Sequence, residues 1–262
     1  MLFGLDLNDF STGISAIITG SLLFTLLHYA LSKQVKEEDL NHDAIGGYFG
    51  VIGTLYAVLI GLVIYDATSK YTSASNNISS ESKAIGETHL YAKQFKSGNI
   101  SREISSLLIN YIDEIVRSDW QHLAEDKNNP KAREFLSQIM LKIESIEPKT
   151  TKEEMYLPIL LQSATNMAES RMVRFDNTTH SLPSCEWVLL SFSASLTLLT
   201  SLFLRVGKTF PQIALSFILS ISILTSLYAV LMFSEPYKGS LRLPMGQLLL
   251  MQKVLHGEFG RF

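Results

Sequence analysis

The chain has 262 residues, of which 47% are apolar and 18% are charged, and its formal net charge at pH 7 is −3. Soluble domains usually carry about 25% charged residues, and a net negative chain offers no basic field that would attract nucleic acid, so we expect no nucleic-acid partner. The single cysteine, Cys185, cannot form a disulfide within the chain, so the fold does not depend on an oxidising compartment.

The apolar residues are concentrated in four blocks, each long enough to cross the hydrocarbon core of a bilayer, which takes about 20 helical residues. The blocks cover residues 13–31, 46–65, 187–204 and 211–233. None contains Asp, Glu, Lys or Arg, each of which costs about 2.5–3.5 kcal/mol in the middle of a membrane. The sequence therefore predicts an integral membrane protein in contact with lipid. The lack of charge at depth argues against a voltage sensor or a proton pump.

The second block contains five glycines, although glycine inside a helix costs about 1 kcal/mol relative to alanine. Four of the glycines and one alanine form two sets with a spacing of four, so each set lies along one helix face and could seat a neighbouring helix backbone. These small residues are Gly46, Gly50, Gly53, Ala57 and Gly61. We predict that this face allows close packing, either of several copies of the same helix or of its neighbouring helices.

An apolar row with the same spacing, Val51, Leu55 and Leu59, is offset from the small residues. If the small face packs on a neighbour, this row faces lipid, the core of the bundle or a central axis. The residues alone favour lipid or the core.

The region between the second and third blocks, residues 67–186, has few turn signals and is predicted to be helical. Its first part continues the second block with the 3–4 spacing of a coiled coil. The apolar or small positions of that stripe are Tyr71, Ala74, Ile78, Ile85, Ala92 and Phe95, with Glu81 and Thr88 in the gaps, and Gly98 is the predicted end of the helix.

Three further helices follow in this region. The face of the first is predicted to consist of Ile104, Leu107, Leu108, Tyr111, Ile112, Ile115, Trp120 and Leu123, and the second is bounded by Pro148. The third begins at a capping box, made either by Thr150 with Glu153 or by Thr151 with Glu154.

The predicted fold class is therefore all-α. Residues 1–66 form a first transmembrane hairpin, 67–186 a helical region continuous with the second span, 187–233 a second hairpin, and 234–262 a C-terminal segment with a short amphipathic helix. Lys and Arg near the spans are more frequent on the side of the termini and of residues 67–186, which the positive-inside rule places in the cytoplasm. The first helix alone favours the opposite orientation, because no positive charge precedes it.

No catalytic constellation is present in the sequence, and we expect neither an enzyme nor a bound cofactor. His122, His180 and His256 lack the spacing of metal ligands, so no metal site is predicted. His28 stands near the end of the first span, where a histidine more often makes an interfacial hydrogen bond than carries a function.

Three stretches of the sequence resemble the bestrophin-like family of bacterial membrane proteins, which is akin to the bestrophin channels. They are LYAVLIGLVIYDATSKYTSASNNISSESKAI, which runs from the second span into a helix, ESRMVRFDNTTHSLPSCEW before the third span, and SEPYKGSLRLP after the fourth. In the last of these, Glu235 and Tyr237 stand where the family has Asp and Phe. The residues that match the family's motifs are Arg171, Arg174, Pro183, Trp187, Glu235, Pro236, Tyr237 and Gly239.

The resemblance implies a homopentameric ion channel in the inner membrane, with the second span lining a central pore. It implies that the pore neck is formed by Val51, Leu55 and Leu59, and that the permeating ions are anions. An apolar neck can gate by dewetting, so a pore without charge at depth is physically coherent.

Two other functions fit the same residues. A membrane scaffold or sensor that does not conduct would use the exposed helical faces of residues 100–146 to recruit a partner. A stator-like proton channel subunit would also combine four spans with a helical region, and would rely on an acidic residue of its partner.

Overall fold

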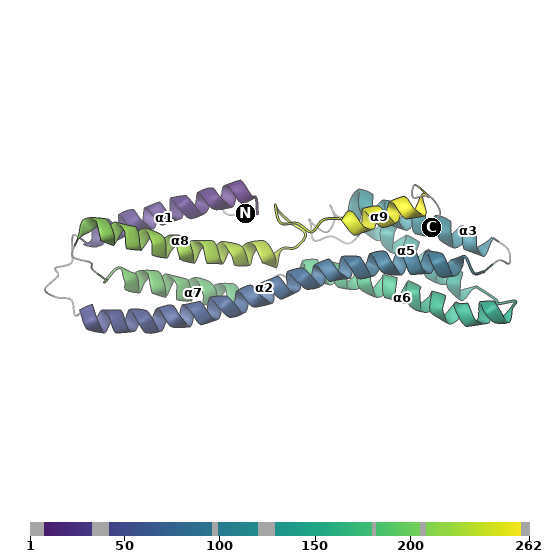
Figure 1. Ribbon diagram of the computed structural model, residues 1–262, viewed down its shortest axis with the longest axis horizontal. Helices are drawn as coiled ribbons and strands as arrows, with labels where there is room; N and C mark the ends of the chain where they lie inside the picture. Colours follow the sequence, from purple (N-terminus) through teal and green to yellow (C-terminus); the bar gives the residue numbers. More distant parts are fainter. Residues whose placement is uncertain are drawn as a thin grey trace. The chain divides into compact units, whose positions relative to one another are not determined.

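The computed structural model describes residues 8–32, 42–95, 99–119, 129–179, 182–204 and 208–257. Their helices, in chain order, are α1 (Phe10–Ser32), α2 (His42–Ala92), α3 (Ile100–Glu114), the π-helix η2 (Ile115–Asp119), α5 (Pro130–Glu144), α6 (Thr151–Thr179), α7 (Ser184–Ser201), α8 (Thr209–Ser234) and α9 (Gly246–Leu255), as seen in Figure 1. These ranges contain no strand, which confirms the all-α class for the part of the chain that is described.

Three of the helices are long and apolar enough to cross a membrane, namely Phe10–Leu31, Asp43–Ala92 and Thr209–Ser234. They contain the first, second and fourth apolar blocks of the sequence. α7 coincides with most of the third block but has 18 residues and is not among the three. The chain is a membrane protein with apolar helices, whereas the four-span topology stays a prediction.

The chain divides into two compact units, and α2 contributes residues to both. Unit 1 comprises residues 1–71 and 181–241, and unit 2 comprises residues 72–180 and 242–262. This division stands beside the four segments predicted from the sequence, whose boundaries stay a prediction.

In unit 1, α1 buries small and polar residues and exposes large apolar ones. Ser21, Thr25 and His28 are buried, while Leu22 and Leu26 are exposed. This inverted pattern is typical of a helix whose apolar side meets lipid and whose polar side meets other helices. The packing thus agrees with a membrane location for this unit.

Close approach of helices in unit 1 depends on two glycines of α1, which packs along α8. A Cβ atom at Gly13 would lie 2.2 Å from the ring of Tyr228, and one at Gly20 would lie 3.0 Å from Leu224. The sequence prediction considered only the glycines of the second block. The spacing of seven residues between Gly13 and Gly20, two turns on one face, was the signal that could have identified them.

The apolar core of unit 1 is built from α2, α7 and α8. Its buried residues are Tyr56, Ile60, Val63, Ala67, Leu182, Leu190, Ala194, Ile223 and Val230. The Tyr56 hydroxyl also lies 2.8 Å from the Ser226 hydroxyl, which satisfies a polar group inside this core.

Unit 2 is a bundle formed by the C-terminal part of α2 with α3, α5, α6 and α9. The predicted α2 stripe is confirmed, because its positions in this unit, Ala74, Ile78, Glu81, Ile85, Thr88, Ala92 and Phe95, are all buried. The predicted face of α3 is also buried at Ile104, Leu108, Tyr111, Ile112 and Ile115. The predicted positions Gly98, Trp120 and Leu123 lie outside the described residues.

The first turn of α6 distinguishes between the two capping boxes that the sequence allowed. The backbone N–H of Glu153 donates to the Thr150 hydroxyl at 3.2 Å, and the Glu153 carboxylate accepts from the backbone N–H of Lys149 at 2.8 Å. The cap is therefore made by Thr150 and Glu153, with Thr150 immediately before the helix.

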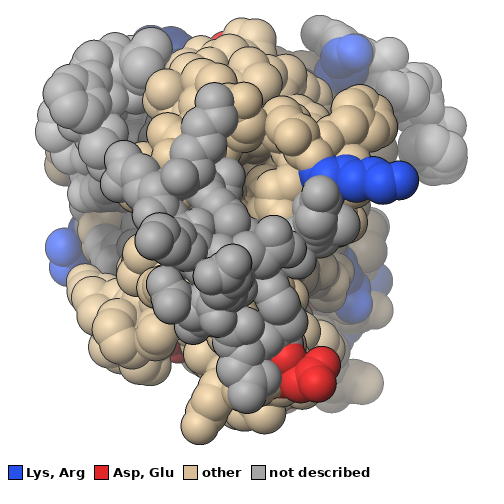
Figure 2. Space-filling view, turned by 90° about the vertical axis from the view of Figure 1, so that its left-hand side faces the viewer, with Lys and Arg blue, Asp and Glu red and all other residues tan. Residues whose placement is uncertain are grey.

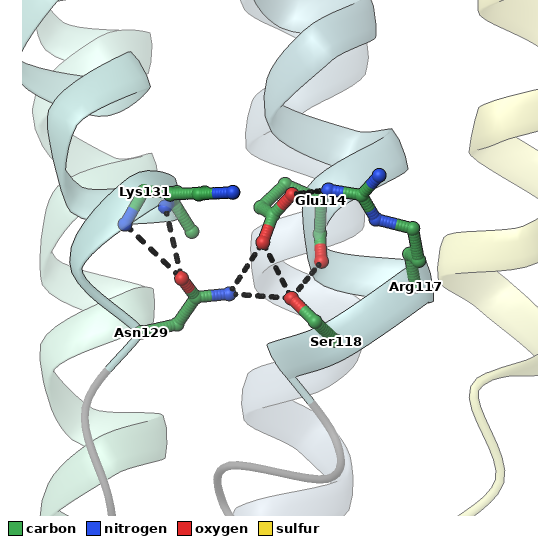
Figure 3. Close-up of polar contacts among 6 residues, drawn as sticks. Glu114, Arg117, Ser118, Asn129 and Lys131 are labelled. Atoms are coloured by element: carbon green, nitrogen blue, oxygen red, sulfur yellow. Dashed lines mark hydrogen bonds and ion pairs between the residues drawn. The ribbon is translucent and has the colours of Figure 1, made fainter.

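A buried polar cluster joins the π-helix η2 to the start of α5 (Figure 3). The Asn129 side-chain amide donates to Glu114 at 3.1 Å and to Ser118 at 2.9 Å, while its oxygen accepts from the backbone N–H of Lys131 at 3.1 Å. Arg117 pairs with the same carboxylate. Burial opposes ionisation of Glu114, but the hydrogen bonds from Ser118, Asn129 and Arg117 outweigh it and lower its pKa. Asn129 thus caps α5 and fixes the end of α3 with one side chain.

Candidate functional site

The apolar row of α2 lies mostly on the side of the helix that faces away from the core of unit 1. Val51 is 61% exposed and Leu55 is 64% exposed, whereas Leu59 is partly buried and packs against the core. The exposed apolar side of the helix continues through Val58 and Leu62. At about 100° per residue, these residues share one face with Val51 and Leu55. Among the described residues of a single chain, nothing packs against this face.

The small residues of α2 flank this face and are also open. A Cβ atom added at Gly46, Gly50, Gly53 or Gly61 would meet no atom of the described chain within 4 Å. Ala57, on the same side, is exposed. Among the described residues of one chain, no other helix packs against these positions. Their predicted role in packing would therefore be in contacts between copies, and it stays a prediction.

Figure 2 views the end of unit 1 at which α2 and α8 begin. Among the coloured residues on this face, uncharged ones predominate and the charged side chains lie near the margin.

The first arginine of the family motif, Arg171, fixes the start of α5. One of its terminal nitrogens donates to the backbone oxygen of Asn129 at 3.1 Å. Its side chain is buried. Arg171 therefore connects α6 to the cluster of Asn129 and Glu114.

The second arginine, Arg174, forms a buried ion pair with Glu81 in unit 2. Its Nε lies 2.9 Å from Oε2 of Glu81, and its Nη2 donates to Oε1 at 3.0 Å. The two side chains are 1% and 0% exposed. An ion pair that includes a charge-assisted hydrogen bond is among the stronger polar interactions in proteins. It joins α2 to α6.

Tyr111 of α3 completes this network. Its hydroxyl donates to Oε1 of Glu81 at 2.7 Å, so three helices meet at one carboxylate. Burial, and then the neighbouring Glu81 charge, raise the pKa of Tyr111 well above its usual value, although Arg171 and Arg174 act in the opposite direction. The hydroxyl therefore stays protonated as a donor. The sequence prediction treated Glu81 only as a gap in the stripe, although an acid on a buried face requires a cation.

Pro183 and Trp187 define the start of α7. The Pro183 carbonyl accepts from the backbone N–H of Glu186 at 2.9 Å and, at 3.5 Å, from that of Trp187. The Trp187 side chain packs against the apolar core of unit 1. These two motif residues thus have structural roles within unit 1.

The last motif lies in the turn after α8 and holds the beginning of α1. The Asn8 amide donates to Glu235 at 3.1 Å, and the backbone N–H of Ser240 donates to the Asn8 carbonyl at 2.9 Å. Pro236 and Tyr237 are buried within this turn. The motif therefore connects two segments of unit 1 that are more than two hundred positions apart in the sequence.

Gly239 is required in this turn for two reasons. Its φ is +67°, a conformation that costs other residues roughly 1–2 kcal/mol, and a Cβ atom would lie 2.3 Å from the Asn8 backbone oxygen. We expect Gly239→Ala to lower the Tm of the purified protein by several degrees, measured by thermal unfolding in detergent. Gly246→Ala is the matched control, because a Cβ there meets nothing within 4 Å. Equal Tm values for both variants would contradict this role.

The described residues contain no group of three or more His, Cys, Asp or Glu that could hold a metal ion. The motif residues have structural roles within unit 1 or within unit 2, and the open α2 face is a separate feature. The structure does not combine these features into one reactive site within the described chain.

Comparisons with known proteins give the chain a family. No curated protein matches it. Two similar solved structures are mutated forms of a bacterial bestrophin homologue from Klebsiella pneumoniae. One is 15% identical, with a TM-score of 0.73 over 92% of this chain and 99% of that one, and the other is 14% identical, with a TM-score of 0.75 over 95% and 100%. At these identities they show that the fold is shared.

The family assignment itself comes from the sequence. The model of the Bestrophin-like domain matches residues 14–245, which is most of the chain. This match includes the open face of α2 and all of the motif residues described above. The chain therefore belongs to the bestrophin-like family.

Proposed function

We propose that this protein is a passive, oligomeric anion channel, with five copies arranged around a central pore. Characterised members of the bestrophin-like family are oligomeric anion channels. The observation that carries the proposal is the side of α2 that faces away from its own chain, which is apolar and, among the described residues, without a partner. A helix that served only as lipid contact would have no need for a flanking row of glycines.

In this proposal, the α2 helices surround the axis and Val51, Leu55 and Leu59 form the neck. The exposure of Val51 and Leu55 supports this position, and Leu59, which is partly buried, lies at the edge of the neck. The neck excludes water because its walls are apolar, and it opens when it wets.

The small residues then serve the contact between neighbouring copies. Gly46, Gly50, Gly53, Ala57 and Gly61 lie beside the apolar face and present backbone rather than side chains. Helices in membranes approach one another most closely at such positions. The glycines would therefore allow adjacent α2 helices to come together around a narrow axis.

In this proposal the chain crosses the inner membrane four times, and α7 is the third span. Both termini and residues 67–186 lie in the cytoplasm in this proposal, because Lys and Arg predominate on that side. Labelling of single cysteines introduced at exposed positions of α5 and α9, in intact and in permeabilised cells, tests this orientation.

The experiment that tests the function uses the full chain, reconstituted in liposomes, with its oligomeric state determined in the same preparation. We expect a fivefold symmetric assembly and a chloride flux that empty liposomes lack. A fivefold assembly without flux would favour the scaffold, and a mixed complex with a different subunit on the axis would favour the stator. Either result would contradict the proposal.

A further inference from the structure

A buried polar network lies at one end of unit 1, where α1 ends and α8 begins. Its central residue is His28 of α1, which is 3% exposed, and its other members are Gln212 and Ser216 of α8, which are also buried. Gln212 also donates to the backbone oxygen of Leu204, three residues after the end of α7. Two helices of unit 1 thus meet at one ionisable ring, and Gln212 links them to the segment that follows α7.

The hydrogen bonds on the Nδ1 side of the ring determine where its proton lies. The Ser216 hydroxyl lies 2.6 Å from Nδ1 of His28 and 2.7 Å from the backbone oxygen of Gln212. The carbonyl oxygen can only accept, so the single hydroxyl proton of Ser216 is donated to it. Ser216 must then accept from His28, and Nδ1 carries the proton.

The Nε2 side gives the same answer independently. Nε2 of His28 lies 2.8 Å from the side-chain nitrogen of Gln212, which also donates to Leu204 O at 2.9 Å. If the Gln212 amide were turned over, its oxygen would face the Leu204 carbonyl oxygen, which is repulsive. The amide nitrogen therefore faces both groups, and Nε2 must accept.

We propose that this network is a proton-sensitive clamp, which holds α1, α8 and the segment just after α7 together only while His28 is neutral. A proton added at Nε2 would point at the amide protons of Gln212, so two donors would face each other inside a buried site. Gln212 would have to turn away, and its bond to Leu204 would be lost. Protonation of one ring thus releases α8 from α1 and from the segment after α7.

No charged group of the described chain competes for this proton. The ring of His28 contacts Phe24, Gln212 and Ser216, and within the described ranges no carboxylate forms an ion pair with it. The ionisable residues on or beside these helices, within the described ranges, are Asp9 and Tyr29 at α1, Cys185 and Glu186 of α7, and Lys208, Tyr228 and Glu235 at α8. None of these is hydrogen-bonded to His28.

The sign of the pH dependence follows from the hydrogen bonds. Neutral His28 fits the network and protonated His28 does not, so separation of the helices is accompanied by proton uptake and is favoured by acid. Because histidine ordinarily titrates near pH 6.5, the loss is expected on acidification from pH 7.5 to pH 5.

The first test determines the tautomer directly. The full chain is labelled with ¹⁵N-histidine, placed in lipid nanodiscs and studied by NMR at pH 7.5. The His28 signals are assigned as those that disappear in His28→Gln. If that variant does not fold, they are assigned as the signals that remain in a protein whose other five histidines are replaced by glutamine. We expect a neutral ring with the proton on Nδ1, whereas a proton on Nε2 would overturn the proposal.

The second test measures Tm at pH 7.5 and at pH 5. In His28→Gln, the new side-chain oxygen accepts from Gln212 and does not titrate. We expect acid to lower the Tm of the wild type by about 2–4 °C more than that of His28→Gln. His256→Gln, at an exposed histidine of unit 2 that contacts Asp113, is the control and should lose at least as much Tm in acid as the wild type. An equal loss in the wild type and in His28→Gln would refute the clamp, whether or not the protein conducts.

Discussion

Replacement of Arg174 by alanine is expected to reduce the free energy of unfolding of unit 2 by about 3–5 kcal/mol. The reason is the position of its partner, because Glu81 is 0% exposed and cannot be hydrated when the guanidinium is removed. Tyr111 would be the remaining side-chain donor to Oε1 in the contacts described. The effect is measured as the urea midpoint for protease resistance of residues 72–180 in the full chain.

Two comparisons separate this effect from a general loss of charge. Lys83 and Glu87 form an exposed pair on the same helix, with a distance of 3.7 Å, and Lys83→Ala should cost no more than about 0.5 kcal/mol. Removal of both buried charges, in Glu81→Met with Arg174→Met, should cost less than Arg174→Ala alone, because no unpaired charge remains. If Arg174→Ala and Lys83→Ala were equally stable, the ion pair would not have the role assigned to it.

The helices of this protein were largely predictable from the sequence, because each follows from a local pattern. The coiled-coil stripe of α2 was predicted at Ala74, Ile78 and Ile85, and all three are buried. The amphipathic face of α3 was predicted in the same way, from a periodicity that a short window contains. Such patterns specify which side of a helix is buried, but they do not identify the helix that covers it.

Contacts between distant segments were not predictable from local patterns. The pairing of Glu81 with Arg174 joins residues 93 positions apart, and the resemblance to the family marked the arginine without its partner. Likewise, Gly239 was identified as a motif residue, but the need for glycine there comes from the close approach of the Asn8 backbone, at the other end of the chain. His28 was interpreted as an interfacial residue, whereas the structure places it in a buried network with Gln212 and Ser216.

The direction in which the α2 row faces was only partly predictable from the sequence. The sequence identified Val51, Leu55 and Leu59 but left lipid, core and axis open, because periodicity has no information about a partner outside the helix. The fold removes part of this ambiguity, since Leu59 packs toward the core while Val51 and Leu55 face outward.

Replacement of Leu55 by alanine is expected to increase anion flux through the proposed neck. The substitution removes three carbon atoms from each copy, so it widens the passage and makes its wall easier to wet. Burial of one methylene is worth about 0.8 kcal/mol, and a barrier lowered by that amount gives a rate about fourfold higher. Flux is measured as chloride efflux per reconstituted oligomer, at equal protein density in the liposomes.

The matched control is Leu23→Ala on α1, because Leu23 is 62% exposed, close to the 64% of Leu55, and loses the same atoms. Leu23 lies on the apolar side of α1, which in the proposed arrangement faces lipid, so its truncation leaves a pore unchanged. A rise in flux with Leu55→Ala and none with Leu23→Ala would assign the outward face of α2 to the conduction path. Equal flux in the two variants, with both correctly assembled, would place Leu55 against lipid instead, since only a residue in the water path can alter how readily that path wets.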